Sequence, residues 1–194
     1  MKRLSHDFYE RDPSLVARGL LGKILVRKVD SEVLSGEIVE TEAYYGGEDP
    51  ASRAYRGRKN FNKLMFMDAG KVFIYMVHAN WLLNIVAHPK SCVGAVLIRA
   101  LDPIEGIEIM RENRNVKDLR NLVSGPGKLT KALAITKELN GIDVTKRGSQ
   151  LTLTDRERKI PEVGSSHRIG VKVDLPQKLR FYVKGNKFVS RSSK

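Results

Sequence analysis

The sequence has few of the features that mark membrane-spanning or secreted proteins. Its 194 residues contain one cysteine, Cys92, so no disulfide can form within the chain. No apolar run approaches the roughly 18 residues that a membrane span needs, and no signal peptide is recognisable. With 41% hydrophobic residues, these absences exclude a membrane protein, a secreted disulfide scaffold and a disordered chain. We expect one intracellular globular domain over residues 1–194, with Cys92 as a small buried hydrophobe.

Acidic residues are also scarce. The chain has 35 Lys+Arg against 22 Asp+Glu, a formal net charge of +13, and two of its segments hold basic residues without acidic ones. Aromatic residues interleave with these cations, which favours nucleic acid over an acidic membrane surface because aromatic faces stack on bases. A generally basic proteome is the alternative explanation. The cations are Arg53, Arg56, Arg58, Lys59 and Lys63 in the first segment and Lys178, Arg180, Lys184, Lys187, Arg191 and Lys194 in the second.

Several common catalytic motifs are missing. The chain has no GxSxG or GxGxxG pattern, and its four histidines lack metal-ligand spacing. The loop Ser124–Lys128 precedes an expected helix and could hold a phosphate with the help of Lys128, but it does not match the Walker pattern. The sequence therefore indicates none of these standard site types.

Apolar patterning predicts more strands than helices. Strand-like runs mostly follow one another, which is typical of an α+β fold with a largely antiparallel or mixed sheet. Asp12-Pro13-Ser14 predicts a capped helix that is ended by Gly22. The other expected helices cover Pro103–Arg114 and Gly127–Ile135, and the expected strands cover Ile24–Val29, Val33–Tyr44, Lys71–Val77, Trp81–Ala87, Gly94–Leu101, Arg168–Val173 and Leu179–Val183.

The densest group of candidate catalytic residues lies in the second strand-like run. Alternate residues of a strand share a face, so Glu40, Glu42 and Tyr44 project together. This group suits cleavage of an N-glycosidic bond. The ring would stack on the base, while the carboxylate takes a proton from water and offsets positive charge developing on the sugar. From spacing alone, solvated glutamates on an exposed strand face are the more common alternative.

Longer motifs run along most of the chain in a consistent order. They are GEIVETEAYYGGEDPAS, Met65-Phe66-Met67, VLIRALDPIEG, SGPGKL, KALAI, RIGV and RFYV. Together they resemble the signature of the 3-methyladenine (alkyladenine, or methylpurine) DNA glycosylase family. The resemblance implies a base-excision repair enzyme that flips a damaged purine, alkylated or deaminated, out of duplex DNA and hydrolyses its bond to deoxyribose. It also implies a single compact α+β domain with a curved sheet, flanking helices and a β-hairpin that inserts into the minor groove.

The resemblance assigns roles to particular residues. Glu42 matches the family's catalytic glutamate. Tyr44 and Tyr75 match the aromatic residues on either side of the flipped base. Asn84 matches an asparagine that disfavours the exocyclic amine of guanine, and Arg99 matches an arginine near the backbone of the flipped nucleotide.

Partners and cofactors follow from the same resemblance. Family members need no metal or other cofactor and use water rather than a lysine Schiff base, so we expect a monomer acting on double-stranded DNA with damaged purines. By their charge, Arg56, Arg58 and Lys128 are expected to hold the DNA backbone. A non-catalytic damaged-DNA binder of the same fold is the alternative, and RNA binding is a third possibility that rests on net charge alone.

Two positions depart from the family pattern. Arg53 stands where the family has a histidine that lines the base pocket, and its permanent charge would repel a cationic alkylated purine. Either Arg53 points to a phosphate, or the preference moves towards neutral lesions such as hypoxanthine or ethenoadenine. At the hairpin tip the family has a tyrosine-glycine pair, whereas this chain reads Val77-His78-Ala79-Asn80. Val77 or His78 is therefore the intercalating residue, and His78 could equally be an ordinary surface turn residue.

Overall fold

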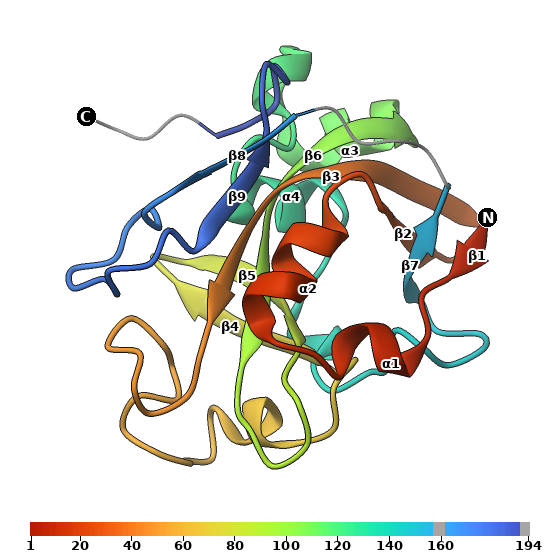
Figure 1. Cartoon of the computed structure of the whole chain (residues 1–194). Helices are drawn as coiled ribbons and strands as arrows, with labels where there is room; N and C mark the ends of the chain where they lie inside the picture. Colours follow the sequence, from red (N-terminus) through yellow and green to blue (C-terminus); the bar gives the residue numbers. More distant parts are fainter. Residues whose placement is uncertain (157–161, 191–194) are drawn as a thin grey trace.

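A long strand, β3 (Glu32–Tyr44), lies at the centre of the sheet (Figure 1). The computed structural model describes residues 1–156 and 162–190. Within them β3 pairs along one edge with β2 and then β9, and along the other edge with β6. The strand order is β1-β7-β2-β3-β6-β5-β4, and β8 pairs with β9. The remaining strands are β1 (Lys2–Arg3), β2 (Ile24–Val29), β4 (Val72–Val77), β5 (Asn80–Val86), β6 (Ala95–Glu105), β7 (Leu151–Asp155), β8 (Val163–Ser166) and β9 (Arg180–Val183).

The sheet is curled, and each pairing among the described strands is antiparallel (Figure 1). Short connections between neighbouring strands in sequence, as between β2 and β3 or β4 and β5, allow this arrangement without crossover helices. The predicted α+β class and single compact domain are confirmed.

Helices pack against the sheet. Helix α2 (Pro13–Leu20) begins as predicted after Asp12, whose carboxylate accepts a hydrogen bond from the Ser14 backbone N–H at 2.8 Å. It packs on β3, while α4 (Pro126–Ala132) packs on β5 and β6. No helix of the described residues has the length and apolar character that a membrane crossing requires. The other helical elements are α1 (His6–Tyr9), α3 (Ile107–Arg114) and the 3-10 turns η1 (Lys63–Phe66), η2 (Leu119–Asn121) and η3 (Lys137–Leu139).

The helix expected from Pro103 begins later than predicted. Strand β6 continues through Pro103 to Glu105, and α3 starts at Ile107. Gly106, at a φ of 74°, makes the change of direction, and a Cβ on it would lie 2.7 Å from the Val33 carbonyl oxygen. A glycine is required there because the backbone is left-handed and β3 is close.

Two other local predictions are wrong. Arg168–Val173 forms no strand, because the Arg168 backbone N–H bonds to the Asp174 carboxylate at 2.9 Å rather than to a neighbouring strand. Cys92 is exposed rather than buried. It lies in a turn closed by its N–H and the Pro89 carbonyl, and the buried strand that follows starts only at Ala95.

The predicted β4–β5 hairpin ends in a two-residue turn. His78 and Ala79 have φ values of 46° and 59°, the left-handed pair typical of a type I′ turn. The Asn80 side chain donates to the His78 carbonyl at 2.8 Å. Gly127, near the start of α4, packs against Asn80, since a Cβ on Gly127 would lie 2.7 Å from the Asn80 Cβ. The hairpin tip is thus held beside the start of α4.

Candidate active site

Strands β3 and β6 bring together a buried charged cluster. Their pairing shifts on both sides of Glu40, so that the register skips Val39 and Arg99. Bulges of this kind redirect side chains. Arg99 Nε donates to Glu40 Oε1 at 2.8 Å, and Arg99 Nη1 donates to Glu42 Oε2 at 3.1 Å. Both glutamates are 0% exposed, so the alternative of solvated glutamates on an exposed face is wrong.

Three donors hold the Glu42 carboxylate. The Tyr44 hydroxyl donates to Oε2 at 2.8 Å beside Arg99, and the Ile169 backbone N–H donates to Oε1 at 2.7 Å. A carboxylate accepts about four hydrogen bonds, so the three described donors leave one acceptor position on Oε1 unused. Burial raises the pKa of Glu42 above its ordinary value, although Arg99 and the Ile169 N–H oppose the rise. The predicted shared face of Glu42 and Tyr44 is confirmed.

Glu40 connects this cluster to the C-terminal segment. Besides Arg99, its carboxylate accepts from Arg180 Nε at 2.7 Å, from the Ser190 N–H at 2.6 Å and from the Ser190 hydroxyl at 2.7 Å. Buried charges are stable only when they are paired and hydrogen-bonded, and Glu40 meets both conditions. Arg99 is therefore fixed in direction by Glu40 as well as by Glu42.

Arg168 supports the Tyr44 ring from behind. Its guanidinium carbon lies 4.5 Å from the ring centroid, and its two Nη atoms donate to Asp49 at 2.6 and 2.7 Å. Arg168 Nη2 also donates to Asp174 at 2.7 Å. Burial would lower the pKa of Arg168, but the hydrogen bonds with Asp49 and Asp174 raise it. Arg168 is thus a permanent cation on one face of Tyr44.

A cavity of about 770 Å³ opens beside the cluster. Tyr44 and Arg99 form part of its wall, and Glu42 lies directly behind these two residues. The hairpin tip and the start of α4 form another side. Of the predicted site residues, Tyr44, Arg53, Tyr75, Val77, His78, Arg99 and Lys128 line the cavity, whereas Asn84, Arg56 and Arg58 do not.

Arg53 and Tyr75 lie together at the cavity wall. The Arg53 guanidinium carbon is 4.6 Å from the Tyr75 ring centroid. A small neighbouring cavity of about 10 Å³ is lined by Tyr44, Arg53, Tyr75 and Asn84, among others, so Asn84 lies near both tyrosines. Its amide donates to the Phe73 carbonyl at 3.2 Å. In this structure the Arg53 side chain is part of the cavity wall and lies over Tyr75. Its predicted contact with a phosphate stays a prediction.

The other predicted DNA-binding residues lie near the surface. Arg56 and Arg58 are exposed and lie in the loop between β3 and η1. Lys128 lines the cavity, and its Nζ donates to the Asn121 side-chain oxygen. Their contacts with DNA stay predictions. Two cations of the predicted basic tail lie outside the described residues, namely Arg191 and Lys194.

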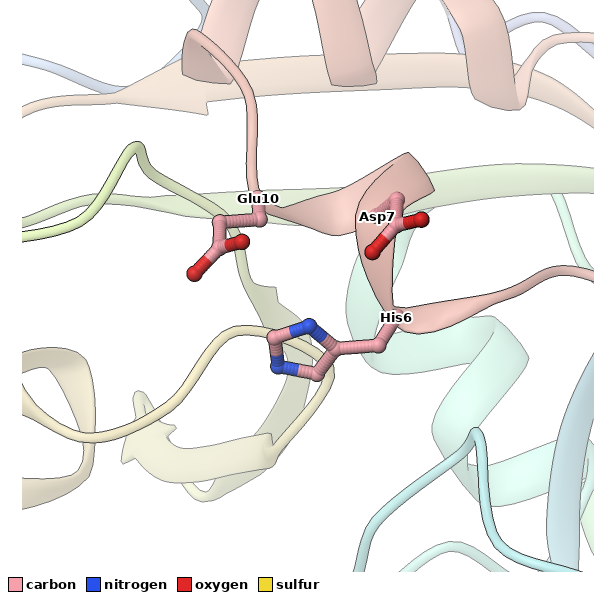
Figure 2. Close-up of side chains that lie close together, drawn as sticks. All are labelled: His6, Asp7 and Glu10. Carbon is pink, nitrogen blue, oxygen red and sulfur yellow. The ribbon is translucent and has the colours of Figure 1, made fainter.

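The described part of the chain has one group of three potential metal ligands, and it lies on α1 and the residue that follows α1 (Figure 2). Ligating atoms of His6, Asp7 and Glu10 lie within 4.8 Å of one another. Spacing among the histidines did not indicate this group, because it joins one histidine to two carboxylates. None of the three lines the cavity, so they lie apart from the candidate active site.

Some residues around Glu42 were not predicted to have a role. Ile169 contributes a backbone N–H, which a side-chain pattern does not reveal. Arg168 and Asp49 are 119 residues apart in the sequence. The sequence did point to both residues, because Asp49 belongs to GGEDPAS and Arg168 to RIGV. These are two of the motifs on which the family resemblance rests.

The fold and the site define a class of basic α+β proteins with a buried carboxylate behind an aromatic, arginine-lined cavity. The methylpurine-DNA glycosylase family matches residues 7–187 of this chain. A protein of Mesorhizobium japonicum is 43% identical over 180 residues, which cover 92% of this chain and 86% of its own. One of Aeropyrum pernix is 41% identical over 191 residues, which cover 97% and 93%. Both are named "Putative 3-methyladenine DNA glycosylase". The chain belongs to the methylpurine-DNA glycosylase family.

Proposed function

We propose that the chain is a monofunctional DNA glycosylase of base-excision repair. It hydrolyses the bond between a damaged purine and deoxyribose in double-stranded DNA. The observation that carries this proposal is the buried Glu42 carboxylate, held behind Tyr44 and Arg99 at the wall of the cavity. Family membership and the names of the relatives support the same reaction.

Glu42 acts as the general base. Its Oε1 takes a proton from a water, whose oxygen bonds to the sugar carbon while the electron pair of the glycosidic bond leaves with the base. The ionised carboxylate also offsets the positive charge that develops on the sugar. Arg99 and the Ile169 N–H keep the carboxylate in one orientation. This lowers the entropy cost of aligning the carboxylate with the attacking water.

Tyr44 and Tyr75 hold the flipped base. Since Arg168 covers one face of Tyr44, the base stacks on the other. Extruding a nucleotide costs a few kcal/mol and costs least for a damaged or mispaired base, which contributes to selectivity. The hairpin tip at Val77 and His78 then fills the gap in the duplex. Basic side chains of the surrounding loops hold the phosphates without reading the sequence.

The wild-type protein is expected to release the base from a duplex with one alkylated or deaminated purine and to leave the sugar-phosphate backbone intact. The backbone survives because water, not a lysine, attacks the sugar. Chromatography of the released base and alkaline cleavage of the abasic product measure this, with the undamaged duplex as control. Binding without release would support the non-catalytic alternative. A preference for duplex RNA would support RNA binding instead.

The rate of base release is expected to fall with decreasing pH, with a midpoint above about 4.3, the ordinary pKa of a glutamate. Glu42 accepts a proton only when it is ionised, and burial raises its pKa, so protonation inactivates it at a higher pH than an exposed carboxylate. Single-turnover rates between about pH 4 and 8 locate the midpoint, and circular dichroism at each pH controls for unfolding. A midpoint at or below the ordinary value would contradict this role of Glu42.

A further inference from the structure

The lining of the cavity is strongly basic. The described residues that line it include four basic side chains and no carboxylate. The four are Arg53, Arg99, Arg114 and Lys128. Three of the four have hydrogen-bond partners outside the pair of tyrosines. Arg99 bonds to Glu40 and Glu42, Lys128 bonds to Asn121, and Arg114 bonds to backbone carbonyls. The fourth cation, Arg53, stands over the ring of Tyr75 and hydrogen-bonds to the neutral Tyr75 side chain, and neither contact neutralises its positive charge.

Arg53 occupies the part of the wall that a base would reach. It lines both the large cavity and the small one, and in each it is accompanied by Tyr44 and Tyr75. A base stacked on the free face of Tyr44 and close to Tyr75 therefore lies within reach of the guanidinium. Arg53 is itself exposed, so solvent screens part of its charge, but like unit charges a few ångströms apart near a protein surface still repel each other measurably.

A charged wall treats cationic and neutral bases differently. A purine alkylated on a ring nitrogen carries a positive charge in the nucleoside, and the guanidinium repels it. A neutral purine meets no such repulsion, its ring stacks on a guanidinium plane, and a carbonyl oxygen or ring nitrogen accepts a hydrogen bond from one of the five N–H groups. Any change in the charge at this position should therefore change the relative rates for the two kinds of base.

We infer that Arg53 makes this site select uncharged damaged purines over cationic alkylated ones. The inference rests on the proposed glycosylase function and adds the class of substrate. It assigns the role to a residue of this chain that differs from the histidine expected there, and it relies on the position of Arg53 over Tyr75 in the cavity.

The test compares two duplexes of the same sequence, one with hypoxanthine and one with 7-methylguanine at the same position. Single-turnover rates with saturating enzyme are measured for the wild type and for Arg53→Gln, and each rate is divided by that of the uncatalysed reaction. The ratio of the hypoxanthine to the 7-methylguanine enhancement is expected to be above one in the wild type and to fall about tenfold or more in Arg53→Gln. Arg53→Lys keeps the charge and is expected to keep the wild-type direction of preference.

Arg56→Gln is the matched control, because Arg56 lies in the same loop, is exposed and does not line the cavity. It is expected to leave the ratio unchanged, even where it weakens binding of both duplexes. An unchanged ratio in Arg53→Gln would overturn the inference while leaving the glycosylase function intact. A change of ratio equal to that of Arg56→Gln would overturn it as well. Release of neither base by the wild type would instead overturn the proposed function, and the inference with it.

Discussion

Replacing Glu42 by glutamine is expected to lower the single-turnover rate of base release by about two to four orders of magnitude. The amide keeps the length of the side chain but takes no proton from water. It also loses the negative charge that offsets the positive charge of the sugar in the transition state. Binding of lesion-containing duplex should remain, because the basic residues that hold the phosphates are unchanged. Quenched-flow base release and fluorescence anisotropy measure the two properties on the same preparation.

Glu37→Gln is the control on the same strand. Glu37 lies on β3 opposite Ile24 and Asp102, and it does not line the cavity, so its replacement should leave base release unchanged. Thermal unfolding of both variants shows whether the fold is intact. If Glu42→Gln released the base at the rate of the wild type, Glu42 could not be the general base. The proposed mechanism would then be wrong.

The strands of the local hairpins are predictable from the sequence, whereas β1, β7 and β8, which pair with strands outside such hairpins or are very short, were not predicted. The alternation and length of Ile24–Val29 and Val33–Tyr44 predicted β2 and β3 within a residue. The error at Pro103 has a physical cause. Proline is common in the first turn of a helix, but Pro103 lies within β6, just after the last fully buried residue of that strand. The helix begins instead after Gly106, whose backbone is left-handed. The position of that glycine depends on its contact with β3, which local sequence does not show.

The site is predictable where it lies on one strand and unpredictable where it depends on distant loops. Glu42 and Tyr44 are two residues apart, so strand geometry alone places them on one face. The donor to Glu42 Oε1 is a backbone N–H at Ile169, 127 residues away, in a segment predicted to be a strand. That segment is a loop because Arg168 satisfies Asp49 and Asp174 together. A charge that bonds to an acid 119 residues away leaves no periodic pattern in the sequence.

Replacing Arg168 by methionine is expected to lower the free energy of unfolding by about 3–5 kcal/mol and to slow base release by the protein that remains folded. The side chains of Arg168 and Asp49 are both 0% exposed, so the substitution leaves a buried carboxylate without its counter-charge. It also removes the cation behind Tyr44 and loosens the loop whose Ile169 N–H holds Glu42. Urea denaturation measures the first effect, and single-turnover kinetics at saturating enzyme measure the second.

The exposed ion pair of Lys184 and Glu162 provides the control for stability. Its side chains are 50% and 76% exposed, so Lys184→Met should leave the free energy of unfolding nearly unchanged. The pH profile separates positioning from mere stability. The Ile169 N–H lowers the pKa of Glu42, so loosening its loop should move the acid limb of base release to higher pH. Arg168→Lys keeps the charge without the double contact to Asp49, and should recover part of the stability. Wild-type stability together with an unshifted acid limb in Arg168→Met would show that Arg168 does not position the site.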